Sequence, residues 1–298
     1  MTEALSTMAL RADARAAAAE VAEARGLTVC ELGDDPAEHR TVEHLLSRIW
    51  STGKEPSPMP GEIMRMLSYT GSYVAGAYRG NRLVGAGVGF LTDTLPDIGA
   101  AHLHSHVVGV AAEARGRQVG FALKLHQRAW ALEHGFDRVT WTFDPLVRRN
   151  AYFNLCKLGA SAVRYLVDFY GDMPDGLNTG QGSDRLLVEW QLNAPEVAAA
   201  AAGTLAQPDA RFGRDDVTHL LRCAARSVPV LAPQPRRGPA VCEIPPDIEA
   251  VRDADPELGV AWRRAVRSVL SAAMSDGTRI AGFDRTLGYL LLDDGDIR

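Results

Sequence analysis

The sequence has few of the features that mark nucleic-acid, metal or membrane proteins. Four of its 298 residues are cysteines, and none forms a Cys-x-x-Cys pair. The spacing argues against a zinc site or a disulfide framework, so we expect free, buried thiols in a reducing cytoplasm and no metal. No run of about eighteen apolar residues occurs, so no membrane span is expected. The N-terminal residues lack the basic start and apolar run of a signal peptide.

Positive charge is not in excess either. The formal net charge is −5 and the charged fraction is 23%. A nucleic-acid partner would usually require a basic patch or stripe, so none is expected. A polyanionic ligand would have to be held by a local site and not by the field of the whole protein. The sequence also lacks the GxxxxGK[ST] and GxGxxG motifs of P-loop and dinucleotide-binding folds.

What the sequence does contain is an alternation of strand and helix patterns over its first 193 residues. The 46% of hydrophobic residues provides for a sizeable core. Gly80-Asn81 is a two-residue hairpin turn between two predicted strands. The pattern predicts an α/β (α+β) fold with a mixed central sheet and helices on both faces. Helices are expected at residues 1–26, 35–50, 62–69, 119–134 and 150–158, and strands at 27–32, 72–79, 82–91, 103–110, 138–143, 162–170 and 185–192.

The composition changes after residue 193. Residues 194–239 are rich in Ala, Pro and Arg without a sustained period, which predicts a linker or irregular segment. A small C-terminal α/β extension follows, with a strand at 241–244, a helix at 255–276 and strands at 278–283 and 287–292. We therefore expect four parts: an N-terminal helix (1–26), a main domain (27–193), the linker (194–239) and the extension (240–298).

The segment that carries chemistry is residues 113–120 (EARGRQVG), between a predicted strand and a predicted helix. A helix N-terminus has unpaired N–H groups and the positive end of the dipole, and a glycine turn lets successive N–H groups point into one concavity. Arg115 and Arg117 add positive charge suited to phosphate oxygens. The pattern predicts a pyrophosphate site.

Residues 110–123 (VAAEARGRQVGFAL) resemble the cofactor motif of the GNAT superfamily of acyltransferases. That motif has a strand valine, often a proline two residues later, and then Arg/Gln-x-x-Gly-x-Gly/Ala. Arg115 and Gly120 occupy its first and last positions. Gln118 stands in place of the middle glycine, and Ala112 in place of the proline.

A second stretch, residues 150–159 (NAYFNLCKLG), resembles the other GNAT signature in Asn150, Lys157 and Gly159. Leu155 occupies the position of the tyrosine that commonly protonates the departing thiolate in this family. More narrowly, the chain is similar to a subgroup of predicted GNAT acetyltransferases with a C-terminal extension.

The resemblance implies that acetyl-CoA or coenzyme A binds where the strands at 103–110 and 138–143 splay apart. Backbone groups of one strand would pair with the pantetheine arm, and the glycine turn would hold the pyrophosphate. The cofactor-binding residues expected on this basis are Val108, Val110, Arg115, Gly116, Arg117, Gln118, Val119, Gly120, Asn150 and Phe153.

Acyl transfer to an amine requires a base, and four residues are candidates: His102, His104, His106 and Asp144. The three histidines alternate onto one face of a strand. His106 is nearest in sequence to the expected thioester and is the predicted catalytic residue, because imidazole titrates near neutral pH. The alternatives are structural histidines near the strand start and a turn-capping role for Asp144. A backbone N–H near Val108 is the expected oxyanion donor.

The resemblance implies a cytoplasmic acyl-CoA-dependent N-acyltransferase that moves acetyl from acetyl-CoA to a small-molecule amine. The alternatives are a non-catalytic acyl-CoA-binding regulatory module on the same scaffold, and O-acyl or succinyl transfer. The sequence leaves open the acceptor, the acyl group and the oligomeric state, including a homodimer. The long polar loop at residues 171–184 is a candidate gate for the acceptor.

Overall fold

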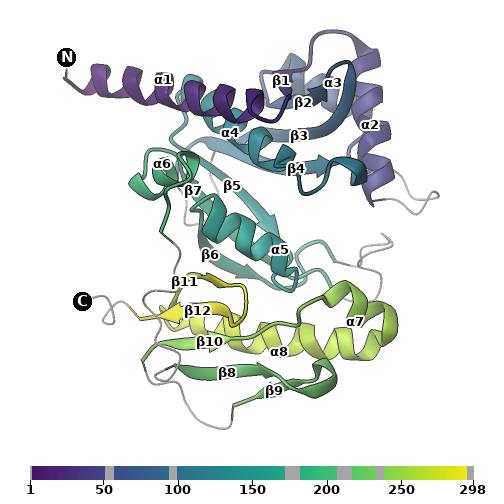
Figure 1. Ribbon diagram of the computed structural model, residues 1–298, viewed down its shortest axis with the longest axis vertical. Helices are drawn as coiled ribbons and strands as arrows, with labels where there is room; N and C mark the ends of the chain where they lie inside the picture. The colour runs from purple at the N-terminus through teal and green to yellow at the C-terminus, as the bar shows by residue number, and fades with distance from the viewer. Residues whose placement is uncertain are drawn as a thin grey trace. The chain divides into compact units, whose positions relative to one another are not determined.

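The computed structural model describes residues 2–50, 57–93, 99–171, 182–206, 217–232 and 238–293 (Figure 1). The chain forms two compact units. Unit 1 comprises Met1–Trp141 and Gln191–Ala202, and unit 2 comprises Thr142–Trp190 and Gly203–Arg298. Within the described ranges, none of the helices is both long enough and apolar enough to cross a membrane.

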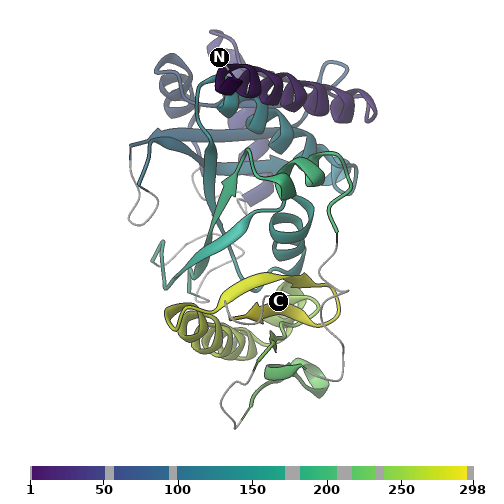
Figure 2. The same cartoon turned by 90° about the vertical axis from the view of Figure 1, so that its left-hand side faces the viewer.

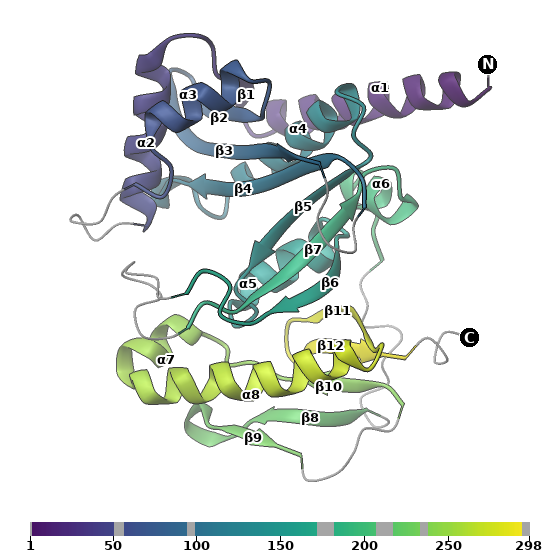
Figure 3. The same ribbon diagram turned by 180° about the vertical axis from the view of Figure 1, so that it is seen from behind.

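Unit 1 contains a mixed sheet whose strands run side by side in the order β1-β2-β3-β4-β5 (Figure 3). The first four strands are antiparallel, and β5 pairs in parallel with β4. The predicted hairpin at Gly80-Asn81 is confirmed, because Arg79 pairs with Arg82 and Gly80 has a φ of 57°. The strands are β1 (Thr28–Glu31), β2 (Val74–Arg79), β3 (Arg82–Thr92), β4 (His102–Val110) and β5 (Arg138–Phe143).

Helices cover both faces of this sheet, as predicted. On one face, the Cβ position of Gly85 on β3 lies against Val119 and Leu123 of α4. On the other face, the Cβ position of Gly109 on β4 lies against Leu46 and other residues of α2. The helices of unit 1 are α1 (Thr2–Glu23), α2 (Pro36–Trp50), α3 (Gly61–Tyr69), α4 (Val119–Glu133) and α6 (Pro195–Ala201), with a 3₁₀ turn η1 (Ala112–Ala114) before α4.

The N-terminal helix α1 lies along α4 on the side away from the sheet (Figures 1 and 2). Its contact side carries Ala14, Ala18 and Ala22, spaced four residues apart and all buried. Small side chains at this spacing let two helices approach closely. Since α4 packs on the sheet with its other side, most of its side chains are buried, including Lys124 and Arg128. The contact with α4 explains why an alanine-rich helix that would be marginal alone is formed here.

The turn from β4 into α4 depends on residues with positive φ. Gly116 has a φ of 75°, and Gln118, the residue before the helix, has φ 62° and ψ 16°. Glycine adopts this left-handed region at no steric cost, whereas a residue with a side chain pays about 1–2 kcal/mol. Gln118 therefore adopts the backbone conformation that the family's glycine would provide, at a steric cost.

Unit 2 contains an antiparallel pair of strands, β6 (Ser161–Leu166) and β7 (Arg185–Gln191), and a five-stranded sheet in the order β11-β12-β10-β8-β9. The helix α8 (Pro256–Ser275) packs along this sheet (Figure 3). Asp255 caps α8 by accepting the N–H of Leu258, as its Asp-Pro start predicts. The remaining elements are α5 (Arg148–Ala151), η2 (Tyr152–Lys157), β8 (Thr218–Cys223), η4 (Ala225–Ser227), β9 (Pro229–Leu231), β10 (Ala240–Cys242), α7 (Ile248–Ala254), β11 (Arg279–Asp284) and β12 (Gly288–Leu292).

A buried ion-pair cluster ties α7 and α8 to the segment after β5. The carboxylate of Asp144 accepts two bonds from Arg263 at 2.6 and 2.7 Å and one from Arg252 at 3.0 Å. It also accepts the N–H of Leu146 at 2.9 Å. Burial alone would raise the pKa of Asp144, but Arg263 and Arg252 outweigh it and hold the pKa well below its usual value.

The structure differs from the sequence prediction in three places. Residues 194–239 were predicted to be irregular, but their described part contains α6, β8 and β9. These elements are short, and β8 and β9 complete a sheet with distant strands, so their local pattern is weak. The predicted helix at 150–158 begins at Arg148 and continues as a π-helical segment from Tyr152. The helix α7, capped by Asp247, was not predicted. The predicted domain boundaries themselves stay a prediction.

Replacing Gln118 with glycine should raise the free energy of unfolding by about 0.5–1 kcal/mol, because the left-handed strain is relieved and partly offset by glycine's larger entropy loss. Urea unfolding monitored by circular dichroism measures the change. Arg115→Gly is the matched control: its φ is −62°, so glycine there should lower stability instead. Equal effects of the two substitutions would contradict the assignment of strain to Gln118.

Replacing Asp144 with Asn should destabilise the fold by about 3 kcal/mol, because two buried guanidinium groups lose their counter-charge. The measurement is urea unfolding at pH 7, with Asp137→Asn, an exposed carboxylate beside Arg138, as a control expected to cost under about 1 kcal/mol.

The stabilisation by Asp144 should depend on pH. Since the folded-state pKa of Asp144 is depressed, its contribution is fully present above about pH 5 and is lost as the pH falls below about 4. A difference between wild type and variant that does not shrink at pH 3 would contradict this account.

Candidate functional site

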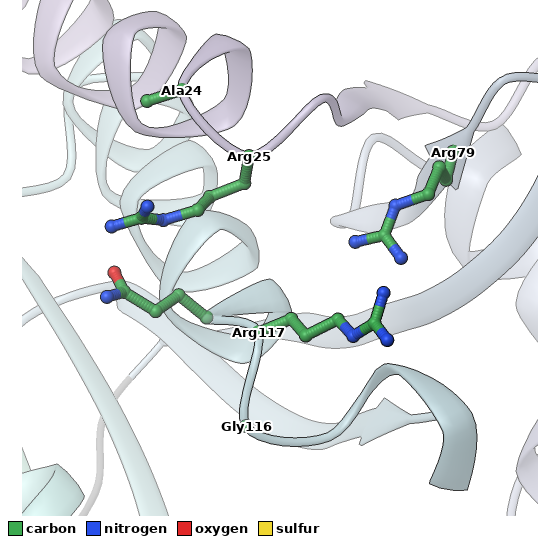
Figure 4. Close-up of a pocket in the computed structure, with 6 residues that line it drawn as sticks. Ala24, Arg25, Arg79, Gly116 and Arg117 are labelled. Carbon is green, nitrogen blue, oxygen red and sulfur yellow. The ribbon is translucent and has the colours of Figure 1, made fainter.

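A pocket of about 400 Å³ opens beside the turn between β4 and α4. Ala24 and Arg25, just after α1, line one side, and Arg79, at the end of β2, lines another (Figure 4). The turn itself supplies Gly116, Arg117 and Gln118. The predicted pyrophosphate segment thus forms one wall of a concave site.

Three arginines from three parts of the chain line this pocket: Arg25, Arg79 and Arg117. The guanidinium groups of Arg79 and Arg117 point toward each other, and that of Arg25 extends to the other side (Figure 4). None of the three forms an ion pair with any residue that the structure describes. The acidic residue of the same turn, Glu113, is engaged elsewhere, because it pairs with Arg82. The pocket therefore has a local positive charge that no ion pair among the described residues neutralises, although the chain as a whole is acidic.

The backbone of the turn adds hydrogen-bond donors. Within the described residues, the amides from Gly116 to Gly120 donate no backbone hydrogen bond, and the amide of Ala122 donates to the carbonyl of Gln118 at 3.0 Å. Successive amides at a helix N-terminus preceded by left-handed residues form an anion-binding concavity. Phosphate oxygens fit both the free amides and the guanidinium groups.

The predicted cofactor residues of the turn differ in whether their side chains or only their backbones can reach a ligand in the pocket. The side chain of Val119 is buried against Gly85 of β3, so only its backbone is available to a ligand. A Cβ at Gly120 would lie 3.7 Å from Cγ2 of Val110. Arg115 is exposed and is not among the residues that line the pocket.

The strands β4 and β5 pair over only two positions, Leu103 with Val139 and His104 with Thr140. β4 continues to Val110 and pairs there with β3 alone: Val108 lies opposite Gly87, and Val110 opposite Gly85. One edge of β4 is thus free of β5 from Ser105 onward, as the predicted splay requires.

A buried lysine lies at this divergence. The ammonium nitrogen of Lys124 donates to Ser105 Oγ at 2.9 Å and to Gln127 Oε1 at 3.0 Å, and lies 3.6 Å from the ring centroid of Trp141. Burial lowers its pKa well below the usual value. Lys124 was not singled out in the sequence, where it is one more residue of a helical pattern.

The opposite face of β4 carries the predicted base. The register between β3 and β4 shifts between Val88 and Gly89. Val88 pairs with Val107 and Gly89 pairs with Ser105, so His106 between them is the extra, bulged residue. A bulge leaves its residue out of the ladder and re-aims the side chain. The rings of His104 and His106 both lie against Phe90, with centroid distances of 5.2 and 5.8 Å.

The other two histidines are held by hydrogen bonds. His102 Nδ1 lies 2.6 Å from the carbonyl oxygen of Ala100, and His102 Nε2 lies 3.1 Å from Oγ1 of Thr140. Nδ1 of His104 contacts the same hydroxyl at 2.9 Å. Burial lowers the pKa of His104 to about 4, assisted by His106, His102 and Lys124, and burial also lowers the pKa of His106. Both imidazoles are therefore neutral near pH 7.

The alternative base, Asp144, is excluded by its surroundings. Its carboxylate is buried and bonded to Arg252 and Arg263, so it stabilises the fold and is not free to take a proton. In the described part of the chain, no group of three or more His, Cys, Asp or Glu side chains is arranged to hold a metal ion. The four cysteines are free thiols, but the prediction that all are buried is wrong, because Cys30 is exposed and Cys223 is partly exposed.

Two predicted cofactor residues belong to unit 2. Asn150 lies in α5 and Phe153 in the π-helical segment η2. Leu155, in the position of the family's usual tyrosine, is buried in the same segment. A role for Asn150 and Phe153 toward the turn of unit 1 stays a prediction. The predicted acceptor gate lies largely outside the described residues, which omit 172–181.

Sequence reasoning did not find Arg25 and Arg79. Neither residue lies near the motif in the sequence: one follows α1, and the other precedes the hairpin turn. Only the packing of α1 on α4 and the pairing of β2 with β3 bring them to the turn. The signal available in the sequence was the position of each arginine at the end of a predicted element.

Comparison with known proteins shows a family similarity over the part of the chain that holds most of this site. Residues 39–156 match the model of the Acetyltransferase (GNAT) family. No curated protein matches the chain.

Several solved structures resemble part of the chain. One is an acetyltransferase of the GNAT family from Streptococcus pneumoniae, with 14% identity and a TM-score of 0.43, covering 55% of this chain and 98% of that one. Another is Chaetomium thermophilum Naa20 in complex with a bisubstrate analogue, with 17% identity and a TM-score of 0.43, covering 61% and 93%. A third is an aminoglycoside acetyltransferase from an uncultured soil metagenomic sample in complex with trehalose, with 16% identity and a TM-score of 0.38, covering 43% and 84%.

At these identities and scores, the similar structures say nothing about the substrate of this chain. The family match covers β2 to β5, the turn, α4 and the first part of unit 2, but not β1. It includes the pocket residues Arg79 and Gly116 to Gln118, but not Ala24 and Arg25. The similarity to the Acetyltransferase (GNAT) family thus rests on residues 39–156, which are less than half of the chain.

Proposed function

We propose that this protein is an acyl-CoA-dependent N-acyltransferase that transfers acetyl from acetyl-CoA to a small-molecule amine. The observation that carries the proposal is the pocket at the β4–α4 turn. It combines arginines and helix N-terminal amides that have no ion pair or backbone hydrogen bond to another described residue, and most of it lies in the part of the chain that matches an acetyltransferase family.

The phosphates of coenzyme A fit this pocket in charge and in hydrogen bonding. The amides from Gly116 to Gly120 would hold the pyrophosphate, which requires donors at close range. Arg117 lies in the same turn, and Arg25 and Arg79 face it across the pocket. The guanidinium groups of Arg25 and Arg79, which lie outside the turn, would bind the additional phosphate on the ribose of the cofactor.

The pantetheine arm would lie along the edge of β4 that β5 leaves unpaired. The parallel pairing ends at His104 and Thr140, and β4 continues for six residues to Val110. An extended ligand can add to such an edge by backbone hydrogen bonds, here to Val108 and Val110. The thioester would then lie toward the bulge at His106, and Asn150 and Phe153 remain the proposed contacts from unit 2.

Transfer requires the amine to lose a proton as its nitrogen attacks the thioester carbonyl carbon. The nitrogen lone pair forms the amide bond, the carbon–sulfur bond breaks, and the electron pair leaves with the CoA sulfur. His106 would take the amine proton and return it to the thiolate through solvent, which balances the reaction. Its ring is neutral at pH 7 because burial lowers its pKa, so it is ready to accept a proton.

The second candidate is a regulatory module that binds acyl-CoA without turnover. It is favoured by Leu155, a buried apolar residue at the position where the family usually supplies an acid to the thiolate. Transfer to a hydroxyl, and transfer of succinyl in place of acetyl, use the same phosphate pocket.

Thiol release from acetyl-CoA in the presence of a panel of primary amines, peptides and alcohols distinguishes these functions. Release that depends on an amine, with a product heavier by one acetyl group, supports the N-acyltransferase. Tight CoA binding without release on any acceptor supports the module. Absence of both binding and release contradicts the proposal.

Replacing Gly120 with Val should lower the affinity for CoA by at least about tenfold, because a branched side chain enters the first turn of α4, where phosphate would approach the amides. Isothermal titration measures the affinity, and circular dichroism checks that the fold is kept. Gly33→Val is the matched control, because Gly33 is exposed and a Cβ there has only an ordinary contact with Glu38. Unchanged affinity in folded Gly120→Val would remove the phosphate site from this turn.

Replacing His106 with Ala should lower kcat/KM for the amine by about 10²–10³-fold, in the range of a lost general base. In the wild type, kcat/KM should be level at pH 7–8 and fall on acidification only below the ordinary imidazole pKa of about 6.5, because burial lowers the pKa of His106 and keeps the base neutral until then. The acid limb should disappear in the variant. His44→Ala, on the exposed side of α2, is the control. An unchanged rate and profile in His106→Ala would exclude His106 as the base.

A further inference from the structure

The contacts around Thr140 form one continuous chain of hydrogen bonds. It runs from the carbonyl of Ala100 to His102 Nδ1 (2.6 Å), from His102 Nε2 to Thr140 Oγ1 (3.1 Å), and from Thr140 Oγ1 to His104 Nδ1 (2.9 Å). His102 and Thr140 are fully buried, and His104 is partly buried. The chain ends at Nε2 of His104, which has no partner among the described residues.

The first hydrogen bond of this series, between His102 and Ala100, determines which atom is the donor in each of the others. A carbonyl oxygen only accepts, so Nδ1 of His102 must carry the hydrogen that it donates to Ala100. Nε2 of a neutral His102 is then an acceptor, and it receives the single hydroxyl hydrogen of Thr140. The oxygen of Thr140 is left to accept, so Nδ1 of His104 must donate to it. Nε2 of His104 consequently carries a lone pair and no proton.

The reverse order is not compatible with the contacts. If Thr140 donated to His104, Nε2 of His102 would have to donate to Thr140, and Nδ1 of a neutral His102 would place a lone pair 2.6 Å from the lone pairs of Ala100. Charging His102 to avoid this clash would bury a cation without a counter-charge. The arrangement therefore fixes His104 in the Nδ1–H tautomer.

The open nitrogen of His104 lies on the face of β4 that carries His106. Both rings pack against Phe90, and the bulge re-aims His106 beside His104. His104 stays neutral throughout the physiological range, since its pKa is about 4. One histidine of the pair is thus held as a constant hydrogen-bond acceptor, while no hydrogen bond within the described residues fixes the tautomer of the other.

We propose that His104 is a substrate-positioning residue whose Nε2 receives one N–H of the acyl acceptor while His106 takes the reacting proton. The proposal rests on the proposed function and specifies its substrate class. A primary amine has enough N–H groups to satisfy both imidazole lone pairs. An alcohol has one O–H and leaves one of the two lone pairs unsatisfied, so the site selects primary amines over alcohols.

Nuclear magnetic resonance of the full chain with ¹⁵N-labelled histidine tests the hydrogen-bond chain without turnover. Nδ1 of His104 should be protonated and Nε2 unprotonated at pH 7. Thr140→Val, which removes the hydroxyl at nearly constant volume, should convert His104 to a mixture of tautomers. Thr142→Val, on the same strand, is the control and should leave it unchanged, since Thr142 contacts Tyr170 and not a histidine. An Nε2–H tautomer in the wild type, or no change in Thr140→Val, overturns the chain.

The same spectra test the contact with the acceptor. With CoA present, n-propylamine should shift the Nε2 resonance of His104 more than n-propanol does at equal concentration, because the single O–H of the alcohol is shared between two lone pairs. In the transfer assay, His104→Leu should raise KM for the amine about tenfold and leave KM for acetyl-CoA unchanged, as expected for one lost hydrogen bond. His104→Gln, whose amide oxygen can occupy the place of Nε2, should stay within about threefold of the wild type.

The outcomes separate this proposal from the proposed function. Equal shifts with amine and alcohol, no shift with either, or equal KM values in the two His104 variants overturn the positioning role. If no acetyl is transferred to any acceptor, the proposed function fails, but the tautomer and the propylamine shift still decide the role of His104 as an acceptor.

Discussion

The turn from β4 into α4 is the constraint on which the candidate site depends. The chain must leave the sheet at Val110 and enter a helix at Val119 that is buried on both sides, against the sheet and against α1. Left-handed backbone at Gly116 and Gln118 makes this turn tight enough that five successive amides donate no backbone hydrogen bond to any residue that the structure describes. Since α4 is buried, its position is fixed, and so is the direction in which these amides point. A helix N-terminus that is rigid and unsatisfied is suited to an anion.

The packing of α1 on α4 has a consequence for charge. The stripe of Ala14, Ala18 and Ala22 keeps the two helices close, and the chain after α1 therefore brings Arg25 to the pocket. Unlike Arg25, Arg79 is placed by the β2–β3 hairpin. The mild negative charge of the whole chain does not oppose this site, because at physiological ionic strength the field of distant charges is screened over about 8 Å. The N-terminal helix is thus a structural part of the candidate cofactor site.

The two faces of β4 have different chemistry at the point where β5 diverges. One face places Ser105 against the buried Lys124, and the other places His104 and His106 against Phe90. The two histidines differ in how they are held. Thr140 forms a hydrogen bond with the ring of His104, whereas His106 lies at the bulge and has no such bond to a described residue. Because burial lowers the pKa of both His104 and His106, these two rings are neutral near pH 7 and can accept protons.

Much of this arrangement could be predicted from local sequence signals, and some of it could not. The strand at 138–143, the hairpin at Gly80-Asn81 and the start of α4 at Val119 follow from β-branched runs, turn residues and helical periodicity, and all are confirmed. Arg25 and Arg79 were missed because contacts between distant elements, and not spacing, bring them to the turn. The bulge at His106 was missed because a register shift leaves no mark in an alternating strand. Asp144 was considered as a base because its sequence position gave no sign of Arg252 and Arg263, over a hundred residues away.

The central claim is that the arginine-lined turn binds the phosphates of coenzyme A. Isothermal titration of the wild-type protein with CoA and, separately, with pantetheine tests it directly, because pantetheine has the arm and the thiol but no phosphate. The account predicts that CoA binds at least about 100-fold more tightly than pantetheine and that the advantage shrinks as salt is raised, since charge-assisted contacts carry it. Equal affinities for the two ligands, or an advantage of CoA that is independent of salt, would contradict the account.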